Sequence, residues 1–187
     1  MRLILASNSP RRKELLAEFG YPFSIVVSDF DEKAFSTDPI ITATQFAKGK
    51  AESVFNLLTD NDCVVIGADT VVYNEGVILN KPANDFAATN MLKFLSGKTH
   101  SVITGYCIKS ANTCQCGYVE TKVTFNNLTD RLVADYVKSG LYKGKSGSYG
   151  IQDPFPLVKD YQGSLNNVVG LPTETIFPII KKMMEEK

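Results

Sequence analysis

The chain has 187 residues, and its 20 basic side chains balance 20 acidic ones to give a formal net charge of zero. A balanced charge argues against a protein that grips nucleic acid through a broad basic field. The length suits one domain over residues 1–187, or two small lobes that share a core, and this size needs no stabilising disulfides. No apolar run approaches the roughly 20 residues of a membrane span, and the run before Ser7 is too short for a signal peptide. We therefore expect a cytoplasmic protein without membrane or nucleic-acid partners.

The four cysteines, Cys63, Cys107, Cys114 and Cys116, are scattered and lack the C-x-x-C spacing of a metal site. In a cytoplasmic protein this pattern predicts free thiols.

The first twenty residues predict a strand, a small polar loop and a helix. Residues 3–6 form a short apolar run, Ser9 is a good N-cap, and Pro10 suits the first helical position. Leu15 and Leu16 begin an apolar face, and Gly20 is a plausible C-terminal stop.

The first turn of this helix carries an unfavourable positive charge. Arg11 and Arg12 lie where the helix dipole already presents partial positive charge, which costs roughly 0.3 to 1 kcal/mol for each cation. An anion would relieve this repulsion, and a helix N-terminus with guanidinium groups suits phosphate. A solvated basic turn is the alternative, and the pattern alone leaves both open.

The rest of the chain predicts an α/β protein by alternating strand and helix patterns. The expected elements are strand 23–27, helix 40–58, strand 62–68, hairpin 71–79, helix 85–95, strands 99–110 and 118–125, helix 130–138, and a final helix through Met184 that Pro178 should bend or restart.

Carboxylates follow two of the predicted strands. Asp31 and Glu32 come after strand 23–27, where a solvated loop is the simpler interpretation of an acidic segment. Asp69 follows an apolar strand and is flanked by small residues, so it should be hydrogen-bonded, metal-bound or at the edge of a cleft. We favour a functional role for Asp69.

Several lysines and the single histidine are ambiguous by pattern. Lys50, on an amphipathic helix, and Lys81, before a proline, would each be assigned to the surface if considered alone. The glycine-rich segment 140–153 could be a phosphate loop or a hinge, because it matches no standard nucleotide motif. His100 is the single histidine of the sequence, which excludes a metal site built from several histidines. We interpret His100 as structural.

The motifs also resemble a known family. The stretch SNSPRRKELL at 7–16 resembles the S-x-S-P-R-R-x-E-L-L signature of the Maf family of nucleoside triphosphate pyrophosphatases. The strings GADTVV at 67–72, SGSYGIQ at 146–152 and QGSLNNVVGLP at 162–172 match further family segments. The resemblance therefore extends from residue 3 to about residue 172.

The resemblance implies a fold, an activity and a cofactor. The fold would be an elongated twisted mixed sheet flanked by helices, with two lobes and a central cleft, as in the Maf and inosine-triphosphatase-like group. The activity would be hydrolysis of a nucleoside triphosphate to the monophosphate and pyrophosphate, with Mg²⁺ or Mn²⁺. A homodimer remains open as its assembly.

The resemblance also assigns roles to individual residues of this chain. Asp69 would accept the proton of the attacking water. The implied catalytic residues are Asp69, Glu32 and Lys81; the implied metal ligands are Glu32 and Asp69; the implied substrate-binding residues are Ser7, Arg11, Arg12, Lys50, Thr70 and Gln152.

The combination of Arg12, Thr70 and Gln152 resembles the branch that acts on dTTP and UTP, and not the branch that acts on 7-methylguanosine triphosphate. Two residues depart from the family pattern: Leu141 replaces a usual glutamate, and Asp153 replaces a usual glycine and could re-aim the Gln152 amide. The rival hypotheses are a nucleotide sensor linked to septum formation and a pyrophosphatase for purine triphosphates.

Overall fold

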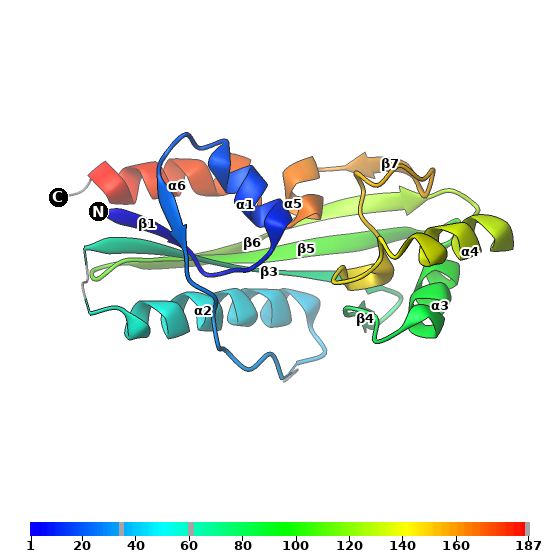
Figure 1. The fold of residues 1–187 in the computed structure, drawn as a ribbon, viewed down its shortest axis with the longest axis horizontal. Coiled ribbons are helices and arrows are strands. Elements are labelled where there is room, and N and C mark those ends of the chain that lie inside the picture. The colour runs from blue at the N-terminus through cyan, green and yellow to red at the C-terminus, as the bar shows by residue number, and fades with distance from the viewer. Residues whose placement is uncertain (34–35, 60–61, 186–187) are drawn as a thin grey trace.

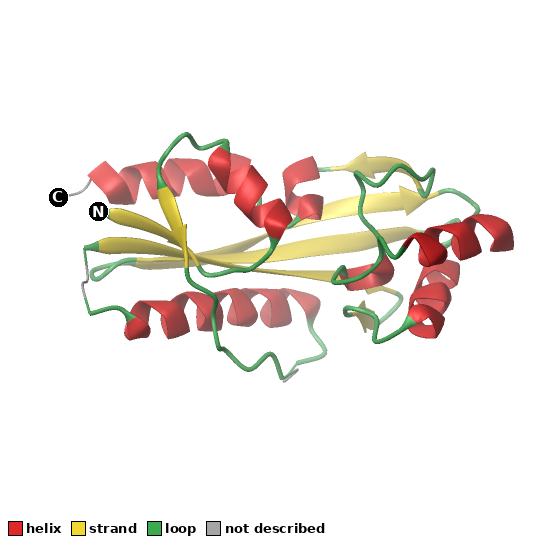
Figure 2. Cartoon of the chain, in the orientation of Figure 1, coloured by secondary structure: helices red, strands yellow, loops and turns green. Residues whose placement is uncertain are grey.

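The computed structural model describes residues 1–33, 36–59 and 62–185, which form an elongated molecule with helices on both sides of a sheet (Figures 1 and 2). The strands are β1 (Arg2–Leu5), β2 (Phe23–Ile25), β3 (Cys63–Asn74), β4 (Val77–Leu79), β5 (Thr99–Lys109), β6 (Cys114–Phe125) and β7 (Val158–Gln162). The helices are α1 (Pro10–Ala17), α2 (Pro39–Leu57), α3 (Asp85–Leu95), α4 (Asp130–Ser139), the short 3-10 helix η1 (Ser146–Ser148), α5 (Leu165–Val169) and α6 (Thr173–Glu185).

The described strands form one mixed sheet in the order β2-β1-β3-β5-β6-β7, with β4 paired to β3. β1 runs parallel to β2 and β3, whereas the remaining pairs are antiparallel. The long strands β3, β5 and β6 form the spine of the molecule (Figure 1). This architecture confirms the predicted α/β class and mixed sheet.

Both faces of the sheet are covered, because alternate residues of each central strand pack against different helices. On β3, Val64 and Ile66 pack in one apolar cluster with residues of α1 and α6, whereas Cys63 and Val65 pack in another with residues of α2. This arrangement explains why these strands are apolar without a break in the sequence.

Two glycines allow α2 to lie very close to the sheet. A Cβ atom at Gly67 of β3 would overlap the backbone carbonyl of Ala47, and one at Gly105 of β5 would overlap that of Ala43. Both glycines face α2, and the register pairs Asp69 with Gly105. This close approach brings the side chains of α2 within reach of Asp69.

A separate apolar core lies at the other end of the long strands. It combines residues of α3 and α4 with Val102, Val123 and Phe125 of β5 and β6. Because each end of the sheet has its own core, the described structure agrees with the predicted two-lobed shape.

Three predicted elements differ from the observed ones. β3 is one continuous strand through Asp69 to Asn74 and does not end near residue 68, because Thr70 to Tyr73 stay paired with β5. β6 begins at Cys114 and not near residue 118. α6 continues through Pro178 without a restart.

The prediction of free thiols is wrong for two of the four cysteines. Cys107 and Cys116 form a disulfide. The two residues lie directly opposite each other on β5 and β6, with Cα atoms 4.0 Å apart. A strand that begins near residue 118, as the sequence predicts, does not include Cys116. The sequence pattern therefore gives no sign that Cys116 is paired with Cys107.

His100 is structural, as predicted. It is buried in the second core, where its Nε2 lies 2.7 Å from the Tyr149 hydroxyl and its ring packs edge-on against Phe125. Burial lowers the pKa of His100 from 6.5 to about 4. The folded protein therefore holds this imidazole neutral at neutral pH.

We expect His100 to make the protein acid-sensitive. Between pH 6.5 and about 4 the unfolded chain binds a proton at His100 that the folded chain does not. The free energy of unfolding should therefore fall by up to about 3 kcal/mol as the pH is lowered through this window. Urea unfolding at several pH values should show a weaker pH dependence for His100→Gln than for wild type. Parallel curves for the two proteins would contradict this assignment.

Among the described residues, none of the helices has both the length and the apolar character that crossing a bilayer requires.

Candidate active site

A cavity of about 470 Å³ brings together all nine residues that the sequence predicted for the site. They are Ser7, Arg11, Arg12, Glu32, Lys50, Asp69, Thr70, Lys81 and Gln152. Among the described residues that line the cavity, six are cationic and two are carboxylates. Such an excess of positive charge suits a strongly anionic ligand.

The first wall of the cavity is the β1–α1 loop and the N-terminus of α1. Ser9 caps the helix by accepting a hydrogen bond from the Arg12 backbone N–H at 3.4 Å, and Pro10 occupies the first turn. The buried Ser7 Oγ accepts from the Ser9 backbone N–H at 3.2 Å. The predicted strand-loop-helix unit is confirmed, and it holds the arginines of the first turn at the cavity.

Arg12 is held by three acceptors, two of which come from distant parts of the chain. Its Nε donates to the Gly170 carbonyl at 2.8 Å, one terminal nitrogen donates to Thr70 Oγ1 at 3.1 Å, and the other donates to Ser7 Oγ at 3.3 Å. Burial lowers the pKa of Arg12, and the nearby Asp69 partly offsets this, but an arginine remains protonated. The guanidinium is thus a fixed charge with a fixed orientation.

Thr70 links Arg12 to a buried chain of hydrogen bonds. Its hydroxyl lies 2.9 Å from the Thr104 hydroxyl, which donates to the Asn167 carbonyl at 2.8 Å. Asp69 and Thr70 are neighbours on β3, so their side chains leave opposite faces of the strand. Asp69 therefore meets α2, whereas Thr70 meets the Arg12 side of the cavity.

The carboxylates and lysines form a compact ionic group on the α2 side. Lys50 Nζ lies 2.6 Å from Asp69 Oδ1 and 2.8 Å from Glu32 Oε1. Lys50 and Asp69 are only 7% and 6% exposed, and Lys81 Nζ lies 4.0 Å from Glu32 Oε2. Although burial alone would raise the pKa of Glu32, the hydrogen bond and charge of Lys50 leave it lowered. Glu32 is therefore ionised at neutral pH.

Arg11 is held less firmly than Arg12. Its one hydrogen bond among the described residues runs from a terminal nitrogen to the Gly144 carbonyl, at 3.5 Å. That carbonyl belongs to the glycine-rich segment, which lines the cavity with Lys143, Lys145 and Ser146. These three residues were not among the predicted site residues, although two lysines between glycines were a usable signal. The segment is a cavity wall, which favours the phosphate-loop interpretation.

Asp153, which the sequence suggested could re-aim the Gln152 amide, makes its contacts with other residues. Its carboxylate turns inward to pair with Lys145 Nζ, at 2.6 Å from Oδ1 and 2.5 Å from Oδ2, and accepts from the Tyr136 hydroxyl at 2.6 Å. Gln152 meanwhile lies exposed at the cavity. Asp153 is therefore part of the buried structure, whereas the neighbouring Gln152 is open to the cavity.

We expect the Lys145–Asp153 pair to matter for stability. Both side chains are under 10% exposed, so Asp153→Asn would leave a buried ammonium without its anion. Removing one partner of a buried pair typically costs about 3 to 5 kcal/mol. Urea unfolding should show a loss of this order, and a second change, Lys145→Met, should recover part of it. An unchanged midpoint for Asp153→Asn would mean that the pair adds nothing.

The family model described as Maf-like protein matches residues 2–183. The chain belongs to the Maf-like family. It is 43% identical over 178 residues to the dTTP/UTP pyrophosphatase of Thermococcus kodakarensis, covering 95% of this chain and 94% of that protein. It is 38% identical over 184 residues to the dTTP/UTP pyrophosphatase of Aquifex aeolicus, covering 98% of this chain and 96% of that protein. It is 39% identical over 188 residues to the dTTP/UTP pyrophosphatase of Clostridium tetani, covering 98% of each chain.

A solved structure shows a weaker likeness to this Maf-like chain. It is a nucleoside-triphosphatase described as a dITP/XTP pyrophosphatase, from Mycobacterium abscessus. The two share 12% identity with a TM-score of 0.46, over 97% of this chain and 95% of that one.

Proposed function

We propose that this Maf-like protein hydrolyses dTTP and UTP to the monophosphate and pyrophosphate in the cytoplasm. The observation that carries the proposal is the cationic cavity that contains a carboxylate pair fixed by Lys50. Its relatives at about 40% identity, aligned over nearly their full length, are named dTTP/UTP pyrophosphatases.

In the proposed reaction a water molecule attacks the α-phosphorus, the bond to the β-phosphate oxygen breaks, and pyrophosphate leaves. Asp69 accepts the proton of the water. Arg12 and Arg11 stabilise the negative charge that moves onto the phosphate oxygens, and Ser7 donates to one of them. Lys50 keeps Asp69 and Glu32 in place, and Lys81 adds a cation on the Glu32 side.

The donor set of the site fits a divalent cation. Lys50 pairs with Oε1 of Glu32 and Oδ1 of Asp69, so it holds the two carboxylates side by side. Mg²⁺ and Mn²⁺ prefer carboxylate oxygens together with substrate phosphates. We propose Glu32 and Asp69 as the ligands. When bound, the cation would neutralise phosphate charge beside the proton-accepting carboxylate.

A second cavity adjoins the first on the side of Glu32 and Lys81. It measures about 430 Å³ and shares five lining residues with the first, namely Glu32, Asp69, Thr70, Lys81 and Ser146. Because Asp69 lines both cavities, a long ligand can extend on either side of it.

We assign recognition of the nucleotide base to Gln152, with Thr70 in a supporting role. A thymine or uracil edge has two carbonyl acceptors around one N–H donor, which an amide can match. A site that leaves such groups unpaired rejects the wrong base strongly. The Thr70 hydroxyl is already engaged by Arg12 and Thr104, so it contributes mainly by positioning Arg12.

Two rival functions remain testable against this one. A nucleotide sensor for septum formation would bind without turnover, and it would not need Asp69 among phosphate-binding cations. A pyrophosphatase for purine or 7-methylguanosine triphosphates would use the same cations with a different base preference.

The deciding experiment is a substrate panel of dTTP, UTP, CTP, dITP and 7-methyl-GTP, with pyrophosphate and orthophosphate measured separately. We expect pyrophosphate release that is fastest with dTTP and UTP, is lost in excess chelator, and becomes less selective in Gln152→Ala. Orthophosphate as the first product, or a preference for the methylated purine, would contradict the assignment. Binding without any turnover would favour the sensor.

A further inference from the structure

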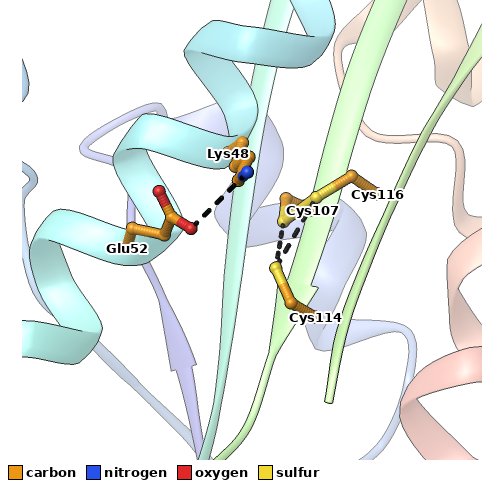
Figure 3. Close-up of a disulfide and its surroundings, with 5 residues drawn as sticks. All are labelled: Lys48, Glu52, Cys107, Cys114 and Cys116. Atoms are coloured by element: carbon orange, nitrogen blue, oxygen red, sulfur yellow. Dashed lines mark hydrogen bonds and ion pairs between the residues drawn. A yellow bond between two sulfur atoms is a disulfide. The ribbon is translucent and has the colours of Figure 1, made fainter.

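Three cysteines lie together at the end of the β5–β6 hairpin (Figure 3). Cys107 on β5 is opposite Cys116 on β6, and Cys114 precedes Cys116 by two residues on the same strand. Residues two apart on a strand face the same side of the sheet, so the three sulfurs converge. Within the described chain none of them lines either cavity of the active site.

The disulfide and the thiol differ in their access to solvent. Cys107 is 0% exposed, Cys116 is partly buried, and Cys114 is exposed. A dissolved thiol therefore cannot reach the Cys107 sulfur directly, whereas it can reach Cys114. Figure 3 shows the Cys114 side chain directed at the disulfide.

The distances place Cys114 in contact with both sulfurs of the bond. Its Sγ lies 3.5 Å from Cys107 Sγ and 3.8 Å from Cys116 Sγ. Thiol–disulfide exchange requires a thiolate to approach one sulfur of the bond and displace the other. Cys107 is the nearer target, and Cys116 would then be the leaving thiolate.

We propose that Cys114 is a thiol-modification site through which the Cys107–Cys116 disulfide exchanges with low-molecular-weight thiols. The Cys114 thiolate attacks Cys107 Sγ, so that a Cys107–Cys114 disulfide forms and Cys116 leaves as a thiolate that takes up a proton. An external thiolate then attacks the exposed Cys114 Sγ, giving a mixed disulfide and the Cys107 thiol. A second external thiol releases Cys114 and leaves as the external disulfide.

These steps balance, because two external thiols are oxidised to one disulfide while one protein disulfide is reduced to two thiols. The same steps in reverse let an external disulfide oxidise the pair. Cys114 is a thiol again at the end in both directions. The Cys107–Cys116 pair thus responds to the thiol pool of its surroundings through the exposed Cys114 sulfur.

The test uses full-length protein with the disulfide formed, and reduced glutathione as the probe. Samples are quenched with acid, alkylated and mapped by mass spectrometry. We expect loss of the Cys107–Cys116 bond in wild type with a transient glutathione adduct on Cys114. In Cys114→Ser the loss should be slower by about tenfold or more, because direct attack on the partly buried Cys116 sulfur is then the remaining route.

Cys63→Ser is the matched control, because Cys63 is a buried cysteine of β3 outside the disulfide. It should lose the bond at the wild-type rate. Circular dichroism should show that both variants are folded. Equal rates for Cys114→Ser and wild type, or an adduct that maps to Cys107 or Cys116, would overturn the proposal. None of these outcomes depends on the hydrolase activity.

Discussion

Asp69→Asn should abolish turnover while nucleotide binding persists. The amide keeps the shape of the side chain and can still accept the hydrogen bond from Lys50 Nζ, now 2.6 Å from Asp69 Oδ1. What it loses is the negative charge with which the carboxylate would take a proton from water and hold the proposed cation. A general base contributes typically about 10²- to 10⁴-fold, so kcat for dTTP should fall by this factor. Steady-state pyrophosphate release and calorimetric binding of dTTP measure the two properties separately.

Asp135→Asn is the control for this experiment. Asp135 lies on α4 with a side chain that is 60% exposed, and it is not among the described residues lining the two cavities. It should keep wild-type activity. If Asp69→Asn retained more than about a tenth of kcat, another group would have to accept the proton. If Asp69→Asn lost dTTP binding as well, Asp69 would be needed for the structure of the binding site and not only for turnover.

The sequence predicted the parts of the site that depend on local rules. The Ser9 cap and Pro10 fix where α1 begins, and this alone places Arg11 and Arg12 at its N-terminus. The apolar run before Asp69 likewise required a partner for a buried carboxylate, and Lys50 is that partner. The family resemblance then selected the remaining members, all of which line one cavity.

What the sequence could not predict are contacts between segments that are far apart along the chain. The acceptor of Arg12 Nε is a backbone carbonyl 158 residues away, and any residue has such a carbonyl. The inward turn of Asp153 depends on Lys145 and Tyr136 being buried beside it. The disulfide depends on the register of β5 with β6, since shifting this pairing by one residue would separate the two sulfurs.

Close packing links the fold to the chemistry. Gly67 and Gly105 let α2 contact β3 and β5 through its backbone, and Lys50 reaches Asp69 from that helix. A side chain at either glycine would push α2 away from the sheet. The distance between the lysine and the carboxylates is therefore set by two residues that carry no functional group.

Arg12→Ala should lower kcat/KM for dTTP by about 100- to 1000-fold, the loss typical when one fixed donor to a developing charge is removed. Arg12→Lys should recover little of it. A single ammonium keeps the charge, but it cannot donate to Gly170, Ser7 and Thr70 in the planar arrangement of the guanidinium. We expect the lysine variant to stay within about tenfold of the alanine variant.

Lys13→Ala is the matched control, because Lys13 lies in the same helical turn but is exposed and outside the described cavity lining. It should keep near wild-type kcat/KM. Thermal unfolding should accompany the kinetics, since Arg12 also ties α1 to Gly170 and its loss could loosen that contact. A fully active Arg12→Lys would show that the site needs only a positive charge at this position. The hydrogen bonds from Arg12 to Gly170, Ser7 and Thr70 would then stabilise the fold without contributing to catalysis.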